Sequence, residues 1–135
     1  MDMLISIKPG FLDKIRDGTK RFEFRKKRHI KDMRFMVFYA TSPIKKIVGY
    51  TKIKRVLVGH KDYIWQKTQQ YAGISKSSYS DYFKTKNTAV AYELDNSVFF
   101  TKQYSFEDLN LDIAAPQSYV YIPEGVIDGI IRNLV

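Results

Sequence analysis

A cluster of charged residues of both signs lies near the amino terminus, in the segment GTKRFEFRKKR (residues 18–28). Glu23 is the only acid in this segment and stands among six arginines and lysines. Lys20 and Arg25 can donate to a phosphate oxygen or a base carbonyl, and the planar guanidinium can do so with two parallel hydrogen bonds. Glu23 can accept from an exocyclic amine or an imino group. By itself this pattern is that of an ordinary amphipathic strand; in a cleft, the same groups suit recognition of a nucleotide. The alternative is that Glu23 only pairs with Arg25 or Lys20 and neutralises a crowded surface.

The elements around this cluster must position its charges. The preceding segment FLDKIRDG has apolar residues at helical spacing and predicts a short helix that ends at Gly18. The segment RFEFR then alternates with period two, so Phe22 and Phe24 face one side and Glu23 and Arg25 the other. We therefore expect a strand that buries two aromatic rings and presents an acid beside a base.

The charge of the chain is strongly positive and unevenly distributed. Lys and Arg total 23 against 14 acids, a formal net charge of +9, and about ten of these cations lie between Lys14 and Arg34. Such a segment attracts polyanions, most often nucleic acid, and the attraction weakens as salt rises. We expect the loop 25–34 to gather phosphates, beginning with Arg25, Lys26, Lys27 and Arg28. The alternative is a basic surface that serves only solubility.

Several classes of protein are not predicted. The chain contains no cysteine, which excludes disulfides, thiolate zinc sites and cysteine nucleophiles. His29 and His60 lie far apart without an evident acidic partner, and no phosphate loop is present, so we expect neither a metal nor a cofactor. No apolar run approaches the roughly 18 residues of a membrane span, and Lys8-Pro9 stands where a secretory signal would be apolar. We expect a cytoplasmic protein without a membrane partner.

The order of the predicted elements indicates a mainly β fold. Strands are expected at residues 3–7, 21–25, 34–40, 47–59, 88–94 and 97–104, with a turn at Asp95-Asn96 between the last two. Helices are expected in an insertion at about residues 60–86, with Trp65 and the stripe of Tyr79, Tyr82 and Phe83 packed inward, and after Pro123. Strands and helices do not alternate regularly. This favours an α+β, mainly β class, a small antiparallel β-barrel surrounded by helices, in a single domain over residues 1–135.

The signature Gly18-x-Lys20-x-x-Glu23-x-Arg25 resembles the G-x-K-x-x-E-x-R motif of the ASCH domain, a member of the PUA-like superfamily. The resemblance continues through FYATSPIKKIVGY (38–50) and PQSYVYI (116–122), and so covers about residues 3 to 122. It implies a PUA-like β-barrel with a cleft beside it. Relatives in this superfamily bind RNA or modified bases, and ASCH proteins are proposed to act on RNA or as translation-linked regulators; some hydrolyse modified nucleosides or cleave RNA.

The resemblance also places further residues in the cleft. Tyr39, Ser42 and Lys45 come from a strand and turn that face it in the family, where a tyrosine can stack on a base and a lysine can hold a phosphate or assist proton transfer. The C-terminal segment adds an amide and hydroxyls that can read a base edge: Gln117, Ser118 and Tyr119. The alternatives are that Tyr39 belongs to the core and that the PQS segment is only a turn.

Our leading hypothesis is an RNA-binding or nucleotide-recognising ASCH module with a basic cleft, a translation- or RNA-linked regulator whose partner is RNA or a nucleotide-like ligand. The alternative is an enzyme, an RNA-cleaving or modified-nucleoside hydrolase that uses Lys20, Glu23 and Lys45 as acid, base and oxyanion stabiliser. A third possibility is a regulator that binds a small nucleotide-like ligand. ASCH proteins proposed as amidohydrolases carry a threonine nucleophile where this chain has Glu23, so that activity is not expected.

Overall fold

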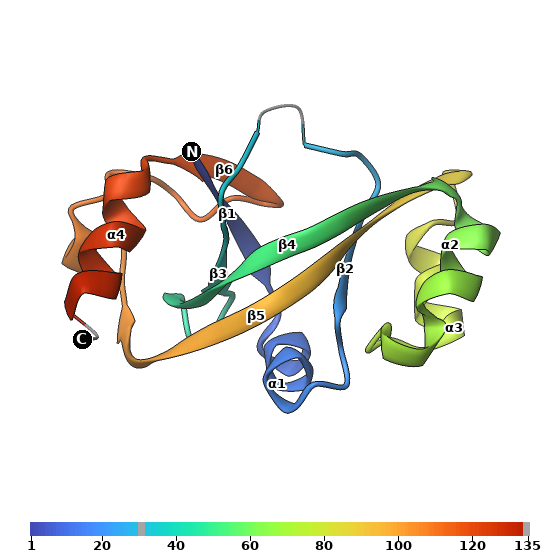
Figure 1. The fold of residues 1–135 in the computed structure, drawn as a ribbon, viewed down its shortest axis with the longest axis horizontal. Coiled ribbons are helices and arrows are strands. Elements are labelled where there is room, and N and C mark those ends of the chain that lie inside the picture. Colours follow the sequence, from blue (N-terminus) through green and yellow to red (C-terminus); the bar gives the residue numbers. More distant parts are fainter. Residues whose placement is uncertain (30–31, 134–135) are drawn as a thin grey trace. The chain divides into compact units, whose positions relative to one another are not determined.

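The computed structural model describes residues 1–29 and 32–133 (Figure 1). The strands are β1 (Asp2–Ile7), β2 (Phe22–Arg25), β3 (Met36–Ala40), β4 (Lys46–His60), β5 (Thr88–Tyr104) and β6 (Tyr119–Ile122). The helices are α1 (Pro9–Asp17), α2 (Lys61–Thr68), α3 (Lys76–Tyr82) and α4 (Glu124–Asn133), with short 3-10 turns η1 (Gln69–Tyr71) and η2 (Glu107–Leu109). Strand content exceeds helix content, which confirms the α+β, mainly β class.

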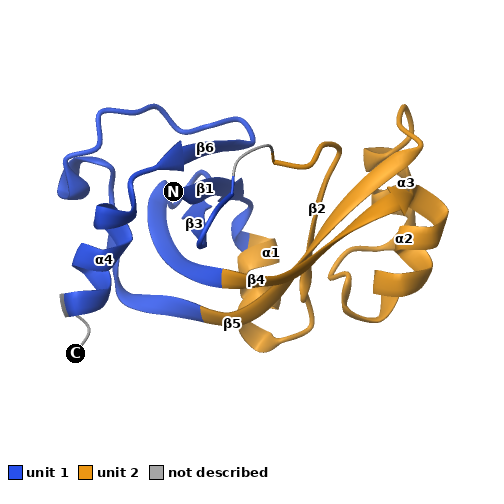
Figure 2. Ribbon diagram, turned by 45° about the horizontal axis from the view of Figure 1, so that its top comes forward, with its two compact units in different colours: residues 1–9, 32–51, 98–135 blue, residues 10–31, 52–97 orange. Residues whose placement is uncertain are grey.

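The strands form one six-stranded sheet in the order β2-β5-β4-β3-β1-β6. The chain divides into two compact units, residues 1–9, 32–51 and 98–135 in unit 1 and residues 10–31 and 52–97 in unit 2 (Figure 2). The long strands β4 and β5 each contribute residues to both units. That the whole chain is one domain stays a prediction.

Unit 1 contains β1 with a partner strand on either side. β1 runs parallel to β3, with Leu4 opposite Val37, and antiparallel to β6, with Leu4 also opposite Val120. The parallel pair adds to the antiparallel pattern that we predicted, and the long stretch of chain between β1 and β3 supplies the crossover that parallel strands need. One cluster of buried apolar residues in this unit comprises Leu4, Val37, Tyr39, Ile47, Phe100, Ile122, Ile127 and Ile130.

Unit 2 contains β2 and the helices of the predicted insertion. β2 pairs antiparallel with β5, with Glu23 opposite Tyr92 and Phe24 opposite Ala91. One cluster of buried apolar residues in this unit comprises Phe22, Phe24, Ile64, Ala72, Tyr79, Phe83, Ala89 and Ala91. Trp65 packs on Tyr79 with ring centroids 4.8 Å apart, as expected for a residue that anchors the insertion.

One predicted turn is absent from the structure. β5 continues from Thr88 to Tyr104 through Asp95 and Asn96, where the sequence predicted a hairpin. Asn96 adopts the left-handed backbone conformation with φ +55°, which asparagine tolerates better than most residues. The asparagine therefore marks an irregular position inside a strand rather than its end.

No helix in the described part of the chain combines the length and the apolar character that crossing a membrane requires.

Candidate functional site

The Glu23–Arg25 pair lies on the face of β2 opposite its phenylalanines. Phe22 and Phe24 are buried in the core of unit 2, as the period-two alternation predicted, but Glu23 is buried as well, with only 6% of its surface exposed. Arg25 Nη1 donates to Glu23 Oε1 at 3.2 Å and to the Phe24 carbonyl at 3.0 Å. This face of β2 is therefore covered, and the ion pair is partly removed from water.

The second carboxylate oxygen of Glu23 has no hydrogen-bond partner among the described residues, although it is buried. A buried polar atom without a partner lowers stability by about 1–3 kcal/mol, and by more when it is charged. Such atoms are rare in native proteins and each needs an explanation. Glu23 Oε2 is thus an acceptor that a bound donor can satisfy.

Lys20 occupies a buried position at the approach to β2, with 2% of its surface exposed. Its Nζ donates to the Ala72 carbonyl at 2.8 Å and lies 5.3 and 5.1 Å from the ring centroids of Phe11 and Phe24. Burial lowers the pKa of this ammonium, Glu23 opposes the shift, and Arg25 and Lys14 add to it. Lys20 thus ties the approach to β2 to the middle of the insertion, between η1 and α3. Its predicted contact with a ligand stays a prediction.

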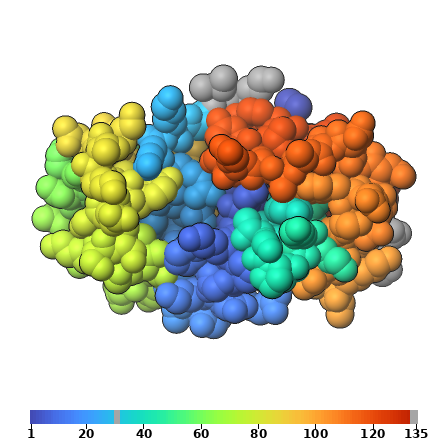
Figure 3. Space-filling view, turned by 180° about the vertical axis from the view of Figure 1, so that it is seen from behind, coloured from blue at the N-terminus to red at the C-terminus, as the bar shows by residue number. Residues whose placement is uncertain are grey.

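The basic segment after β2 presents three consecutive exposed cations, Lys26, Lys27 and Arg28. The segment is anchored at its far end, where the His29 backbone N–H donates to the Tyr92 hydroxyl at 2.9 Å and His29 Nδ1 lies 2.9 Å from the same oxygen. Ile30 and Lys31 lie outside the described residues. On the face drawn in Figure 3, blue atoms of this region lie directly beside the yellow and yellow-green atoms of the helical insertion.

Arg34 ends the predicted basic loop but makes ion pairs within unit 1. Its Nη2 donates to Asp2 at 2.8 Å and its Nη1 to Asp128 at 2.7 Å. These hydrogen bonds, chiefly the one to Asp2, raise the pKa of Arg34. Of the predicted loop 25–34, the described residues that offer exposed positive charge are therefore the three directly after Arg25.

Tyr39 belongs to the buried core of unit 1. Its side chain is 5% exposed, and its ring stacks on Phe106 with centroids 4.7 Å apart and planes inclined by 15°. Burial raises the pKa of its hydroxyl. One ring face is thus already occupied, and stacking on a base stays a prediction.

The other predicted residues of unit 1 gather around the end of β1. The Thr41 N–H donates to the Ile7 carbonyl, and this contact begins the exposed turn of Ser42 and Lys45, with a cis bond before Pro43. The Ser6 hydroxyl donates to the Pro116 carbonyl at 2.7 Å and the Ser6 N–H to the Ser118 carbonyl at 3.0 Å. These bonds hold Gln117, Ser118 and Tyr119 beside the same strand, with Gln117 and Ser118 exposed.

The predicted site residues therefore fall into two groups within the two units. Residues 20–28 belong to unit 2, whereas Tyr39, Ser42, Lys45 and the segment 117–119 belong to unit 1 (Figure 2). A single cleft that unites both groups stays a prediction.

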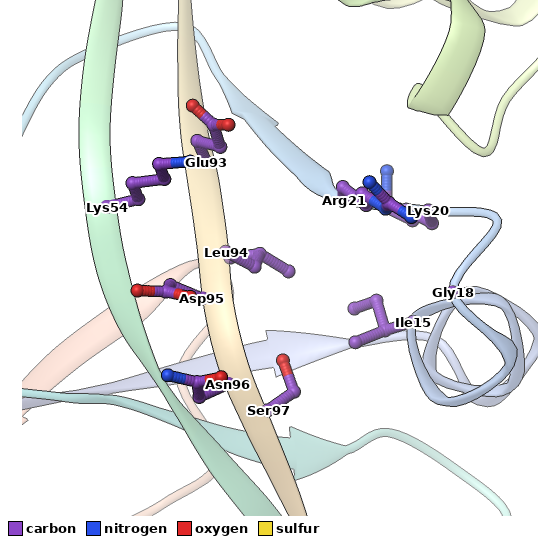
Figure 4. Close-up of a pocket in the computed structure, with 10 residues that line it drawn as sticks. All are labelled: Ile15, Gly18, Lys20, Arg21, Lys54, Glu93, Leu94, Asp95, Asn96 and Ser97. Carbon is purple, nitrogen blue, oxygen red and sulfur yellow. The ribbon is translucent and has the colours of Figure 1, made fainter.

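Unit 2 also contains a hollow of about 340 Å³ that the sequence did not predict (Figure 4). Its lining residues are Ile15, Gly18, Lys20, Arg21, Lys54, Glu93, Leu94, Asp95, Asn96 and Ser97. The side chains of Ile15 and Leu94 point into it, and Lys54 points toward Glu93, which also pairs with Arg55. Its lining is of mixed charge and favours no particular ligand class. Among the described residues, no group of three or more histidines and acids is arranged to hold a metal ion.

The comparisons with known proteins identify the family. The model of the ASCH domain matches residues 5–97. The chain belongs to the ASCH domain family. The matched range includes β2, the basic segment and the turn at Ser42 and Lys45, but not the PQS segment at 116–118.

Two curated relatives are similar to part of this chain. The chain is 29% identical over 94 residues to an ASCH domain-containing ribonuclease of Zymomonas mobilis. The aligned region covers 69% of this chain and 64% of the relative. It is 27% identical over 106 residues to the large ribosomal subunit protein uL22 of Ureaplasma parvum. This aligned region covers 78% of the chain and 34% of uL22. The chain thus spans slightly less than two thirds of the first relative and about a third of the second.

Solved structures show the same fold over almost the whole chain. The crystal structure of ASCH from Zymomonas mobilis superposes with a TM-score of 0.86 at 23% identity and covers 97% of this chain and 94% of that one. The N-terminal domain of Staphylothermus marinus McrB gives a TM-score of 0.60 at 13% identity, with 97% and 93% covered. At these identities the likeness shows the fold alone.

Proposed function

We propose that this ASCH protein binds RNA through unit 2. The observation that carries the proposal is the succession, within six residues, of a buried carboxylate with an unpartnered oxygen, an arginine beside it, and three exposed cations. The similarity to a protein named as a ribonuclease supports RNA as the polyanion.

The two parts of this segment have different tasks. Lys26, Lys27 and Arg28 attract phosphates without regard to sequence, because their charges are exposed and have the sign opposite to the backbone of RNA. The Glu23–Arg25 pair is recessed and holds a donor and an acceptor close together, which suits the edge of an unpaired base. The basic segment would thus supply affinity, and the pair would recognise one nucleotide.

A binding experiment tests this proposal. A triple variant replaces Lys26, Lys27 and Arg28 with glutamine. It is expected to bind a single-stranded RNA about tenfold or more weakly at low salt, because three phosphate contacts are lost. The matched control neutralises Lys76, Lys102 and Arg132, three exposed cations outside the segment, and lowers the net charge equally. If both variants lose the same amount of RNA affinity, the loss is due to the lower net charge, and a binding site at this segment is contradicted.

RNA cleavage is a second candidate function, because the relative from Zymomonas mobilis is named as a ribonuclease. Cleavage by the 2′-hydroxyl needs a base to take its proton and an acid to protonate the departing 5′ oxygen. Glu23 would act as the base through its unpartnered oxygen. Lys20 would act as the acid only after its ammonium leaves the Ala72 carbonyl, because that bond and its burial keep it from a substrate.

Product formation separates the two functions. Incubating the protein with a labelled RNA and following the products on a gel should show time-dependent cleavage that Glu23→Gln abolishes while binding persists. If the native protein yields no product with an RNA that it binds, cleavage is contradicted and binding stands.

A further inference from the structure

One tyrosine of the helical insertion is exposed beside the Glu23–Arg25 pair. Tyr82, the last residue of α3, keeps 36% of its surface exposed, whereas Tyr79 and Phe83 of the same predicted stripe are buried. Among the described residues Tyr63 is the other tyrosine with comparable exposure, and it lies on α2. The sequence predicted a core position for Tyr82 that the structure does not bear out.

The ring of Tyr82 is held in a fixed orientation. The buried ring of Phe83 meets it edge-on, with centroids 4.8 Å apart and an angle of 81° between the planes. Lys26 Nζ lies over the Tyr82 ring, 4.8 Å from its centroid, so a stacking base takes the place of this ammonium or uses the opposite ring face. An aromatic ring that is exposed yet supported from behind loses little conformational entropy when it binds, which is the property of a stacking platform.

The Tyr82 hydroxyl lies close enough to the ion pair for both of its charges to act on the pKa of the hydroxyl. Burial raises this pKa, the charge of Arg25 lowers it and the charge of Glu23 raises it, and hydrogen bonding with the Arg25 side chain and the Lys26 N–H lowers it further. The Arg25 guanidinium itself donates to Glu23 Oε1 and to the Phe24 carbonyl. Because Lys26, the next residue along the chain, lies over the Tyr82 ring, the tyrosine, the arginine and the unpartnered Glu23 Oε2 belong to one part of unit 2.

We propose that Tyr82 stacks on an unpaired base of RNA whose exocyclic amine donates to Glu23 Oε2. This proposal rests on the proposed RNA-binding function and specifies which nucleotides the site accepts. An exocyclic amine projects from the ring edge, and adenine, cytosine and guanine carry one. Because Glu23 Oε2 is buried, the amine reaches it only when the cover of this oxygen opens on binding. Uracil has only a ring N–H between two carbonyl oxygens, which the carboxylate repels. The site therefore favours amine-bearing bases over uracil.

The test uses the full chain and short single-stranded oligoadenylate, oligocytidylate and oligouridylate of equal length, with affinity measured by fluorescence anisotropy. Tyr82→Ala is expected to weaken binding of the adenine and cytosine oligomers by about tenfold, the effect of one lost stacking contact. Tyr82→Phe keeps the ring and should bind within about threefold of the native protein. Tyr63→Ala is the matched control, because Tyr63 is also exposed and has a lysine, Lys67, over its ring.

An oligoadenylate in which abasic sites replace the bases distinguishes stacking from structural support. If Tyr82 stacks on a base, the native protein and Tyr82→Ala bind the abasic oligomer equally, and Glu23→Gln reduces the preference over uracil. If Tyr82→Ala weakens abasic and normal oligomers alike, the residue only supports the fold and the proposal is overturned. If Tyr82→Ala binds like the native protein while the Lys26, Lys27 and Arg28 variant does not, stacking is wrong and the proposed function stands. If neither variant changes binding, the proposed function fails as well.

Discussion

Lys20 shows how a single buried charge makes stability depend on pH. Because burial lowers the pKa of its ammonium below the ordinary value of 10.5, the folded protein loses this proton at a lower pH than the unfolded chain does. Between the two pKa values the unfolded chain binds more protons, so this group makes the folded state more stable as pH rises. Below the folded pKa the penalty for burying the charge is present in full.

Replacing Lys20 with methionine removes this titration and keeps an unbranched side chain that is one atom shorter. We expect the unfolding free energy of the native protein, relative to that of Lys20→Met, to rise with pH through the alkaline range and to level off above about 10.5. Urea unfolding of both proteins from pH 7 to pH 11 measures the difference. Two curves that stay parallel over this range would show that the ammonium is not disfavoured by burial.

Arg34 has the opposite relation to its surroundings, because it compensates a buried acid. Asp2 is fully buried and accepts from Arg34 Nε and Nη2, whereas the second partner, Asp128, is about half exposed. Arg34→Gln leaves Asp2 as a buried charge without its cation and is expected to lower the unfolding free energy by about 3–5 kcal/mol. Asp128→Asn removes an exposed pair and should change it by less than about 1 kcal/mol. Chemical denaturation measures both, and equal effects would contradict this difference.

At the scale of elements, Gly73 follows η1 and the Ala72 carbonyl to which Lys20 donates. It adopts φ +69°, and a Cβ added there would lie 2.4 Å from the Lys20 Cβ. We expect Gly73→Ala to lower the unfolding free energy by about 2 kcal/mol or more, because the left-handed conformation alone disfavours alanine by roughly 1–2 kcal/mol. Gly129 lies inside α4 with no atom within 4 Å of an added Cβ, so Gly129→Ala should raise it by about 0.5–1 kcal/mol. Thermal melts of the two variants should shift in opposite directions.

Some features of these helices and strands could be predicted from the sequence, and others could not. The alternation of RFEFR and the glycine at the end of FLDKIRDG were sufficient to predict β2 and the end of α1, because the first depends on local periodicity and the second on a backbone conformation that glycine adopts. The burial of Glu23 was not predictable, since alternation tells which face a side chain takes but not what covers that face. The i, i+3, i+4 spacing likewise placed Tyr82 with Tyr79 and Phe83, although at the end of α3 only two of the three rings turn inward. Asp95-Asn96 is typical of a turn, and only the pairing of β5 shows that the strand continues.

At the scale of the whole molecule, the net charge of +9 gives RNA binding a component that every exposed cation shares. A site-specific component differs from it in salt dependence, because only cations that contact phosphates release counterions from the RNA. A stacking contact releases none. The dependence of affinity on salt therefore separates the tasks that we assign to the basic segment and to Tyr82.

We expect the slope of log affinity against log salt to become less steep by about 2 when Lys26, Lys27 and Arg28 are replaced by glutamine, since each phosphate contact to a single strand contributes about 0.7. Tyr82→Ala should lower affinity for an adenine oligomer at every salt concentration and leave the slope unchanged, because the ring carries no charge. Titrations at four or more salt concentrations from about 50 to 300 mM measure both slopes. If the triple variant keeps the native slope, its cations do not contact phosphates, and RNA must bind elsewhere on the molecule. If Tyr82→Ala changes the slope instead, the tyrosine acts by positioning Arg25 or Lys26 on a phosphate, and its role as a stacking platform is contradicted.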